Sequence, residues 1–266
     1  MSDDHDDFGG ISRDLPRLLG RRRMLGLFAG GAAMTLAAAC SSSPASSSSS
    51  SSSGGAAASQ GSGAIPEETG GPYPADGSNG PNVLDHAGIV RSDIRSSFGA
   101  STTTAQGVPM RIDLTLRDSS GAALPGAAVY LWHCDRDGNY SLYSRAVTAE
   151  NYLRGVQAAD DAGTLSFTSI FPACYQGRWP HVHFEIYRSL ADATSSGNAL
   201  RTTQLALPKE TCEAVYATDG YSSSVRTLSQ VSLTSDMVFR DGWDRQLATM
   251  TGDVASGYTA SLPVVV

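Results

Sequence analysis

The chain has 266 residues, of which 41% are hydrophobic, and a formal net charge of -7. This length and composition suffice for the core of one or two domains, and we expect one. Because the chain has a single lysine, Lys209, and only one basic run, at 21–23, neither nucleic acid nor an anionic membrane surface is expected as a partner.

Residues 1–39 have the composition of an export signal. Three arginines at 21–23 precede a run of about fifteen apolar or small residues, which is shorter than the roughly 20 that a membrane-spanning helix needs. The twin arginine with its apolar pair resembles a Tat signal, and residues 36–40 resemble a lipobox. We therefore predict a Tat-exported, extracytoplasmic protein that is lipid-anchored at Cys40. The alternative is a plain secreted protein.

Residues 40–63 are almost entirely Ser, Gly and Ala. Such a segment cannot bury enough apolar surface to offset the entropy lost on ordering, so it predicts a flexible tether. Residues 64–266 are then the folded domain. Its first part, 65–74, is rich in turn-forming Gly and Pro, so we expect an irregular arm across the surface, a candidate wall of a pocket.

Many short apolar segments follow, each bounded by turn residues. The clearest alternates Met110, Ile112, Leu114 and Leu116 with polar residues, the period of two that a half-buried strand requires. Further strands are predicted at 128–134, 164–171, 181–187 and 202–207, with short ones near 237–239, 247–252 and 258–266. One helix is predicted, at 209–216. This pattern indicates an all-β sandwich with little helix.

The strand at 181–187 carries a candidate metal site. Its apolar residues alternate with polar ones, so His181 and His183 share the face opposite the apolar side chains. Strand residues at i and i+2 are about 7 Å apart, close enough for two imidazoles to share one ion at about 2.1 Å from each nitrogen. A pair of surface histidines without metal is the alternative.

Few residues are available to complete such a site. Of the five histidines, His5 lies in the leader, and only His86 and His133 remain besides the pair. His86 is expected at the surface. His133 shares a strand face with Val129 and Leu131, so a hydrogen-bonded core-edge histidine fits at least as well as a ligand. The further donors are one of these histidines, a carboxylate, a thiolate or a tyrosine.

Two tyrosines lie at suitable places. Tyr175 precedes His181 by six residues, and Tyr140 follows a Gly-containing turn after the strand at 128–134. A free tyrosine has a pKa near 10, so it binds at neutral pH only to a strongly Lewis-acidic ion, and phenolate suits Fe(III). Two imidazoles and two phenolates would leave that ion one positive charge, which suits an anionic substrate. Each tyrosine alone is equally an ordinary aromatic at a strand edge.

Three cysteines remain once Cys40 is assigned to lipid. An exported protein can keep a disulfide, and we predict one between Cys174 and Cys212 because both lie beside loops. Closing the 37 intervening residues would stabilise the fold by about 4 kcal/mol in the chain-entropy model. Cys134 is then expected to be a small buried residue, with metal ligation as the alternative.

Four segments resemble the intradiol ring-cleavage dioxygenases, the family of the catechol and protocatechuate 3,4-dioxygenases. They are residues 69–73, 132–140, 163–175 and 178–184, and the last two are the most specific. The resemblance extends to residue 207. It implies the family's β-sandwich and a non-haem Fe(III) enzyme that uses O2 to cleave a catechol-type ring between its two hydroxylated carbons.

Transferred by motif, the resemblance also implies roles for single residues. Tyr175 would leave the iron when substrate binds, and Arg178 would stabilise charge developing on the ring. Gln204 would line the pocket, and Trp132 would stack near the substrate, with a core tryptophan as the alternative. The implied iron ligands are Tyr140, Tyr175, His181 and His183.

A second interpretation belongs to a different class of protein. A metal-free transthyretin-like sandwich used for surface binding or adhesion would share the strands and turns between residues 110 and 171. It would leave the two tyrosines and the histidine pair without a role. The interval from Tyr175 to His181 is shorter than in protocatechuate dioxygenases, and export is unusual for this catabolic family, so the particular catechol and the oligomeric state stay open.

Overall fold

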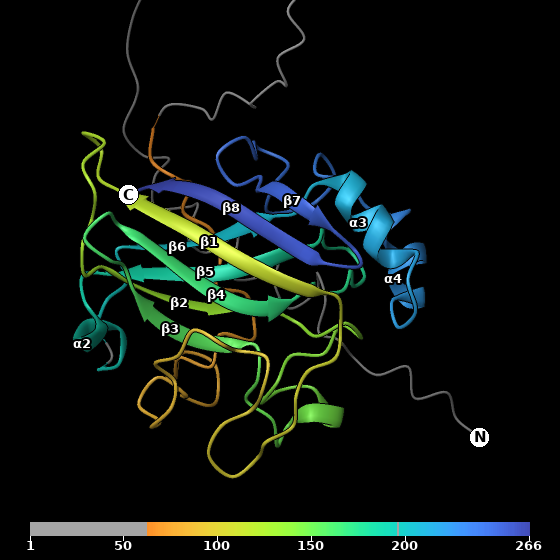
Figure 1. The fold of residues 1–266 in the computed structure, drawn as a ribbon, viewed down its shortest axis with the longest axis horizontal. Coiled ribbons are helices and arrows are strands. Elements are labelled where there is room, and N and C mark those ends of the chain that lie inside the picture. The colour runs from red at the N-terminus through yellow and green to blue at the C-terminus, as the bar shows by residue number, and fades with distance from the viewer. Residues whose placement is uncertain (1–62, 196) are drawn as a thin grey trace, which may run out of the picture.

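Two four-stranded β-sheets are stacked face to face in the computed structural model, which describes residues 63–195 and 197–266 (Figure 1). One sheet has the strand order β4-β1-β8-β7, and the other has the order β3-β2-β5-β6. The all-β sandwich with little helix is confirmed. Its strands are β1 (Pro109–Arg117), β2 (Ala128–Trp132), β3 (Arg154–Ala158), β4 (Thr164–Ile170), β5 (His181–Tyr187), β6 (Arg201–Ala206), β7 (Thr249–Asp253) and β8 (Gly257–Val265).

The helical segments are short. They are a 3-10 turn at Arg145–Val147 and the helices α2 (Leu190–Ala193), α3 (Lys209–Tyr216) and α4 (Ser222–Leu228). The predicted helix at 209–216 coincides with α3. In Figure 1, α3 and α4 lie together at one end of the sandwich.

The first sheet forms around β1. Its apolar residues Met110, Ile112, Leu114 and Leu116 are all buried in the core between the sheets. β1 pairs antiparallel with β4 and parallel with β8. Because burying each such side chain contributes about 1.5 to 3 kcal/mol, the alternation in sequence determines which face of the strand turns inward.

β5 lies inside the second sheet, between β2 and β6. Val182, Phe184 and Ile186 join the core between the sheets, as predicted. The opposite face is buried as well, since all seven residues of β5 are buried. The expectation of a half-buried strand is therefore wrong. The face that carries His181 and His183 is covered by another part of the chain.

That cover is the irregular arm ahead of β1, which runs along the second sheet (orange to yellow in Figure 1). The Glu68 N–H donates to Thr202 O at 2.7 Å, and Tyr130 Oη donates to Pro74 O at 2.7 Å. The arm was predicted, but its extent was not. Apolar arm residues pack with β2 in a separate buried cluster: Ala75, Val83, Leu84 and Ile89.

Two predicted strands differ from the structure. Residues 237–239 form turns, because the N–H groups of Val238 and Phe239 both donate to the Asp236 carboxylate. This Asx-type arrangement competes with strand pairing. The strand expected at 247–252 is displaced toward the C-terminus and is β7.

Four elements were not predicted: the 3-10 turn, α2, β3 and α4. β3 has five residues, which include an arginine, a glycine and a glutamine, so it shows no apolar alternation. α4 begins with three serines, residues that favour caps and turns over helix interiors. Both form because tertiary packing outweighs weak local preference.

The predicted leader at 1–39 lies outside the described residues. So does the predicted tether at 40–63 apart from its last residue, and with it Cys40. Among the residues that the structure describes, no helix has the length and hydropathy that crossing a membrane requires.

Candidate metal centre

Two imidazole nitrogens meet at the start of β5. His181 and His183 extend from its outer face, and their Nε2 atoms are 3.0 Å apart. His183 lies opposite Gln204 of β6 on one side and Trp132 of β2 on the other. The period-two geometry of the strand thus brings the two side chains together, as their spacing predicted.

Tyr140 reaches the same point from the turn after β2. Asp135 shapes this turn, because its Oδ1 accepts hydrogen bonds from the N–H groups of Asp137 and Asn139 at 2.9 and 2.8 Å. Tyr140 is 2% exposed, and its Oη lies 3.5 Å from His181 Nε2.

Tyr175 comes from the loop between β4 and β5. Its Oη lies 3.2 Å from His181 Nε2 and 3.4 Å from Tyr140 Oη. Unlike Tyr140, it is only half-buried. Two residues later, Gly177 at a φ of 78° turns the chain back, a conformation that glycine adopts without strain. Tyr140 Oη, Tyr175 Oη, His181 Nε2 and His183 Nε2 together form the four-donor cluster.

The spacing of the four-donor cluster fits a single metal ion. Donors about 2.1 Å from a common ion, at angles of about 90° to 109°, are about 3.0 to 3.4 Å apart. The three separations among Tyr140 Oη, Tyr175 Oη and His181 Nε2 are 3.2, 3.4 and 3.5 Å, and His183 Nε2 lies 3.0 Å from His181 Nε2. Elsewhere in the described chain, no three His, Cys, Asp or Glu side chains gather in a way that could hold a metal ion.

His181 is presented in the tautomer that coordinates a metal through Nε2. His181 Nδ1 lies 2.5 Å from Trp179 O, so Nδ1 carries the proton and Nε2 keeps its lone pair toward the cluster. Burial, followed by the nearby Arg178 guanidinium, holds the pKa of His181 well below 6.5. Burial and the neighbouring His181 lower the pKa of His183 in the same way. Both rings are therefore neutral at neutral pH.

The tyrosines need a cation to become ligands. Burial, with a further contribution from the Tyr175 phenol, raises the pKa of Tyr140 well above 10. Such a phenol keeps its proton at neutral pH unless a strong Lewis acid displaces it. Two neutral imidazoles and two phenols are a donor set that fits a hard trivalent ion such as Fe(III).

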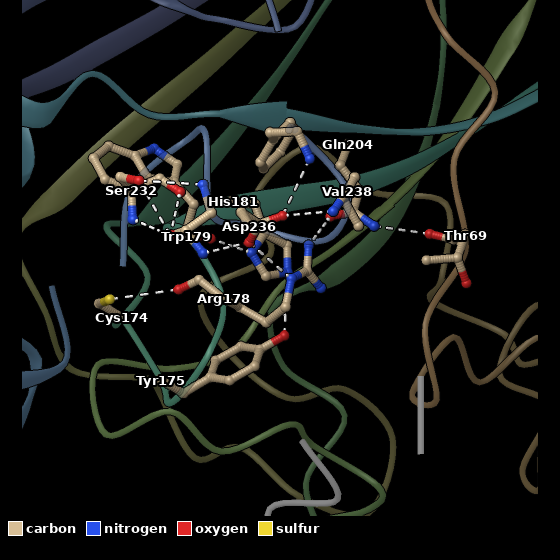
Figure 2. Close-up of polar contacts among 12 residues, drawn as sticks. Thr69, Cys174, Tyr175, Arg178, Trp179, His181, Gln204, Ser232, Asp236 and Val238 are labelled. Atoms are coloured by element: carbon tan, nitrogen blue, oxygen red, sulfur yellow. Dashed lines mark hydrogen bonds and ion pairs between the residues drawn. The ribbon is translucent and has the colours of Figure 1, made fainter. Parts of the chain in front are cut away.

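Arg178 and Gln204 form a polar network beside the cluster (Figure 2). Arg178 Nη2 donates to Gln204 Oε1 at 2.6 Å, and Gln204 Nε2 donates to Thr69 O of the arm at 2.8 Å. Both side chains are buried. The two predicted residues thus lie together, and the arm borders the site.

The other side of Arg178 is held by a residue that sequence reasoning missed. Asp236 Oδ2 accepts hydrogen bonds from Arg178 Nε at 3.0 Å and from the Trp179 N–H at 2.6 Å. Asp236 is fully buried. It lies in a polar loop beyond residue 207, where the family resemblance ends, so no motif marked it.

Tyr73 of the arm was also missed. Its ring packs on Tyr140, with ring centroids 4.8 Å apart, and on Tyr143 at 5.2 Å. Tyr73 ends the motif at 69–73, which was the signal that could have identified it. The arm therefore covers one ligand as well as contacting Gln204.

Trp132 is fully buried. Its ring stacks on His183, with centroids 5.1 Å apart and an interplanar angle of 5°. It also stacks on Tyr130, two residues earlier in β2, with centroids 4.9 Å apart. This is the arrangement expected of the alternative, a core tryptophan. Its contact in the structure is with a candidate ligand.

The remaining histidines and Cys134 have ordinary surroundings. His133 is buried, and its two ring nitrogens each have a partner at 2.7 Å, Cys134 O and Ser169 Oγ. His86 is exposed beside Asp85. Cys134 is buried and free. The expectations of a hydrogen-bonded core histidine, a surface histidine and a small buried cysteine are confirmed.

Cys174 and Cys212 are free, so the predicted disulfide is not formed in the structure. Cys174 Sγ faces Arg178 O at 3.5 Å, and Cys212 Sγ faces Leu207 O at 3.9 Å. Burial raises the pKa of Cys174 to about 12 and that of Cys212 well above 9. Both side chains belong to the core between the sheets.

Comparison with known proteins finds similarity to dioxygenases. The family model described as "Dioxygenase" matches residues 79–187. Chlorocatechol 1,2-dioxygenase from Rhodococcus opacus is 39% identical over 67 residues, 25% of this chain and 26% of that protein. Catechol 1,2-dioxygenase from Pseudomonas sp. (strain EST1001) is 38% identical over 60 residues, 23% of this chain and 20% of that protein. The match thus spans about a quarter or less of each curated relative.

A solved structure shares the fold. The intradiol ring-cleavage dioxygenase from Tetranychus urticae superposes with a TM-score of 0.59 at 22% identity, over 76% of this chain and 94% of that one. The matched family segment ends at the last residue of β5, and the solved structure shares the sandwich around it, so the chain is similar to dioxygenases in sequence and to an intradiol ring-cleavage dioxygenase in fold.

Proposed function

We propose that the protein is a non-haem Fe(III) dioxygenase that cleaves catechol-type rings between their two hydroxylated carbons with O2. The observation that carries this proposal is the four-donor cluster, in which the two phenol oxygens and His181 Nε2 lie 3.2 to 3.5 Å from one another and His183 Nε2 lies 3.0 Å from His181 Nε2. The names of the two curated relatives, catechol and chlorocatechol 1,2-dioxygenase, support the substrate class. A metal-free binding module would have no use for the cluster.

The proposed iron ligands are the four members of the cluster. When bound there, ferric iron would lower the pKa of a coordinated diol and activate its ring toward O2. Two phenolates reduce the 3+ charge of the ion to one positive charge. A site with this residual charge favours an anionic diol over a neutral aromatic.

Tyr175 is placed to accept a proton from the substrate. It is half-buried, whereas Tyr140 is 2% exposed and lies under Tyr73, so Tyr175 is the phenol with room to move. As the diol takes its place, Tyr175 Oη would take up one of the hydroxyl protons, acting as a general base. Tyr140 would keep its position.

Arg178 and Gln204 would act on the ring. The Arg178 guanidinium is buried, 2% exposed, in surroundings where a positive charge acts more strongly than in water. It would stabilise negative charge that develops on the ring during the reaction. Gln204, held by the arm at Thr69 O, would border the bound diol.

We further propose that the enzyme works outside the cytoplasm, held on a tether. The twin arginine and apolar run at 21–39 support Tat export, and the Ser, Gly and Ala composition of 40–63 supports a flexible spacer. Cys40, at the end of a lipobox-like sequence, is the proposed lipid site.

The test of the proposed activity is oxygen uptake by the iron-loaded full-length protein with a panel of catechols. At least one should consume one O2 per ring, and with labelled oxygen the product should be a muconate-type diacid carrying both oxygen atoms. Tyr175→Phe, which keeps the ring but cannot take up a proton, should lower kcat by at least tenfold. No uptake with any catechol, or a ring opened beside the hydroxylated carbons, would contradict the proposal.

A further inference from the structure

We propose that Asp236 is a positioning residue for Arg178, and that the loop at 232–239 thereby sets the orientation of the guanidinium toward the substrate. This inference rests on the proposed function. It concerns a part of the chain outside the matched family segment, which ends at residue 187.

The Asp236 carboxylate is fixed by four hydrogen bonds (Figure 2). Oδ1 accepts from the N–H groups of Val238 and Phe239 at 2.8 and 3.2 Å, which anchors the side chain in its own loop. Oδ2 accepts from Arg178 Nε and from the Trp179 N–H. Because Asp236 is fully buried and accepts at both oxygens, it offers Arg178 a rigid partner.

Arg178 is held from two directions. Asp236 fixes Nε at 3.0 Å, and Gln204 fixes Nη2 at 2.6 Å. A guanidinium is planar, so two anchored N–H groups define the plane of the whole group. Gln204 is bonded in turn to the arm at Thr69 O, whereas Asp236 is bonded to backbone N–H groups of its own loop. The carboxylate is therefore the anchor that decides where the positive charge lies.

Asp236 also compensates the charge of Arg178. The two side chains are 0% and 2% exposed and form a buried ion pair, in which the carboxylate offsets the cost of burying the guanidinium charge. The pair adds no net charge to the site. The attraction for an anionic diol then comes from the residual positive charge proposed for the metal centre. Arg178 contributes through the orientation of its guanidinium toward the ring.

Asp236 is also connected to the candidate ligand His181, through Trp179. The Trp179 N–H donates to the same Oδ2, and Trp179 O accepts from His181 Nδ1. Asp236 could therefore act through Arg178 or through the ligand His181. Action through Arg178 leaves iron binding unchanged, whereas action through His181 does not.

The experiment is a double-mutant cycle in the iron-loaded full-length protein. Asp236→Asn keeps the size of the side chain but can accept at one oxygen only. Alone it should retain iron and the tyrosinate charge-transfer band, while kcat/KM falls about 100-fold, the cost expected of a group displaced by about 1 Å. In an Arg178→Gln background it should cause no further loss. Asp244→Asn, an exposed carboxylate in the following loop, is the matched control and should leave kcat/KM unchanged.

A crystal structure of Asp236→Asn gives a readout that does not depend on activity. The guanidinium should leave its wild-type position while the four donors stay in place. An unmoved Arg178, a loss of iron, or additive effects in the cycle would each overturn the inference. Absence of ring cleavage in the wild-type protein would refute the proposed function, and the position of Arg178 would still decide the inference. If Asp236→Asn does not fold, Asp236→Glu, which keeps the charge but displaces it, is judged by the same criteria.

Discussion

Whether a histidine of this protein can bind a metal depends on where its neighbours place its proton. The Nδ1–H of His181 donates a hydrogen bond to Trp179 O, which leaves Nε2 available in the four-donor cluster. Both ring nitrogens of His133 are engaged, by Cys134 O and Ser169 Oγ. The two residues are equally buried, so burial alone does not separate a ligand from a structural histidine.

His181→Ala is expected to abolish iron binding, because Nε2 of His181 is the atom within 3.5 Å of all three other donors. Iron content should fall at least tenfold, and the visible tyrosinate-to-iron band should disappear with it. The control is His86→Ala, which removes an exposed histidine and should leave both unchanged. Retention of full iron and colour in His181→Ala would show that the ligand assignment is wrong.

His133 should make the fold sensitive to acid. Burial lowers the pKa of His133 from 6.5 to about 4. Between these two pH values, His133 is protonated in the unfolded chain and neutral in the folded chain. The free energy of unfolding should therefore fall as pH falls, by about 2 kcal/mol from this residue between pH 6.5 and 5. His133→Gln removes the titrating group. Its denaturation midpoints should depend less on pH over that range, and a slope equal to that of the wild type would contradict the prediction.

Among the elements, the arm and β5 depend on each other. The outer face of β5 carries polar and titratable side chains, which can be buried only because the arm supplies partners and excludes water. Sequence periodicity found the strand and the residues on each face. It could not show that the polar face is buried, because the irregular arm that covers this face has no alternation of apolar and polar residues from which its position could be predicted.

Tyr143→Phe should loosen the arm. The Tyr143 Oη accepts from the Ala75 N–H at 2.8 Å and donates to Asn79 O at 2.8 Å, so its loss leaves a buried backbone donor unpaired. The free energy of unfolding should fall by about 1 to 3 kcal/mol. Amide hydrogen exchange at residues 73–79 should accelerate. Tyr258→Phe, whose ring packs against Phe171, is the matched control, and equal exchange in the two variants would count against this role.

The same contrast explains which parts of the site could be predicted. Tyr140, Tyr175, His181 and Arg178 lie in segments of recognisable composition and spacing, and the structure brings them together as expected. Asp236 could not be found in this way. Its role follows from a loop after α4 that contacts Arg178, 58 residues away in the chain, and no local pattern encodes such a contact.

For the whole molecule, the proposed picture is a sandwich domain with its metal centre under the arm, joined to a leader by a polar spacer. The net charge of -7 and the single lysine disfavour adhesion to anionic membranes by charge alone. A lipid at Cys40 is the proposed means of membrane attachment.

Cys40→Ala tests that attachment. If Cys40 carries lipid, the wild-type protein should sediment with membranes and the variant should appear in the soluble extracytoplasmic fraction, with ring cleavage unchanged because the domain is intact. Fractionation followed by immunoblotting measures this. Equal distribution of the two proteins would mean that the chain is a plain secreted protein.

The central claim is that one ferric ion is held by two phenol oxygens and two imidazole nitrogens. The most direct measurement is anomalous X-ray scattering at the iron absorption edge from crystals of the iron-loaded full-length protein. The account predicts one strong peak per chain, enclosed by Tyr140 Oη, Tyr175 Oη, His181 Nε2 and His183 Nε2. A peak elsewhere, or no peak in protein saturated with iron, would contradict it.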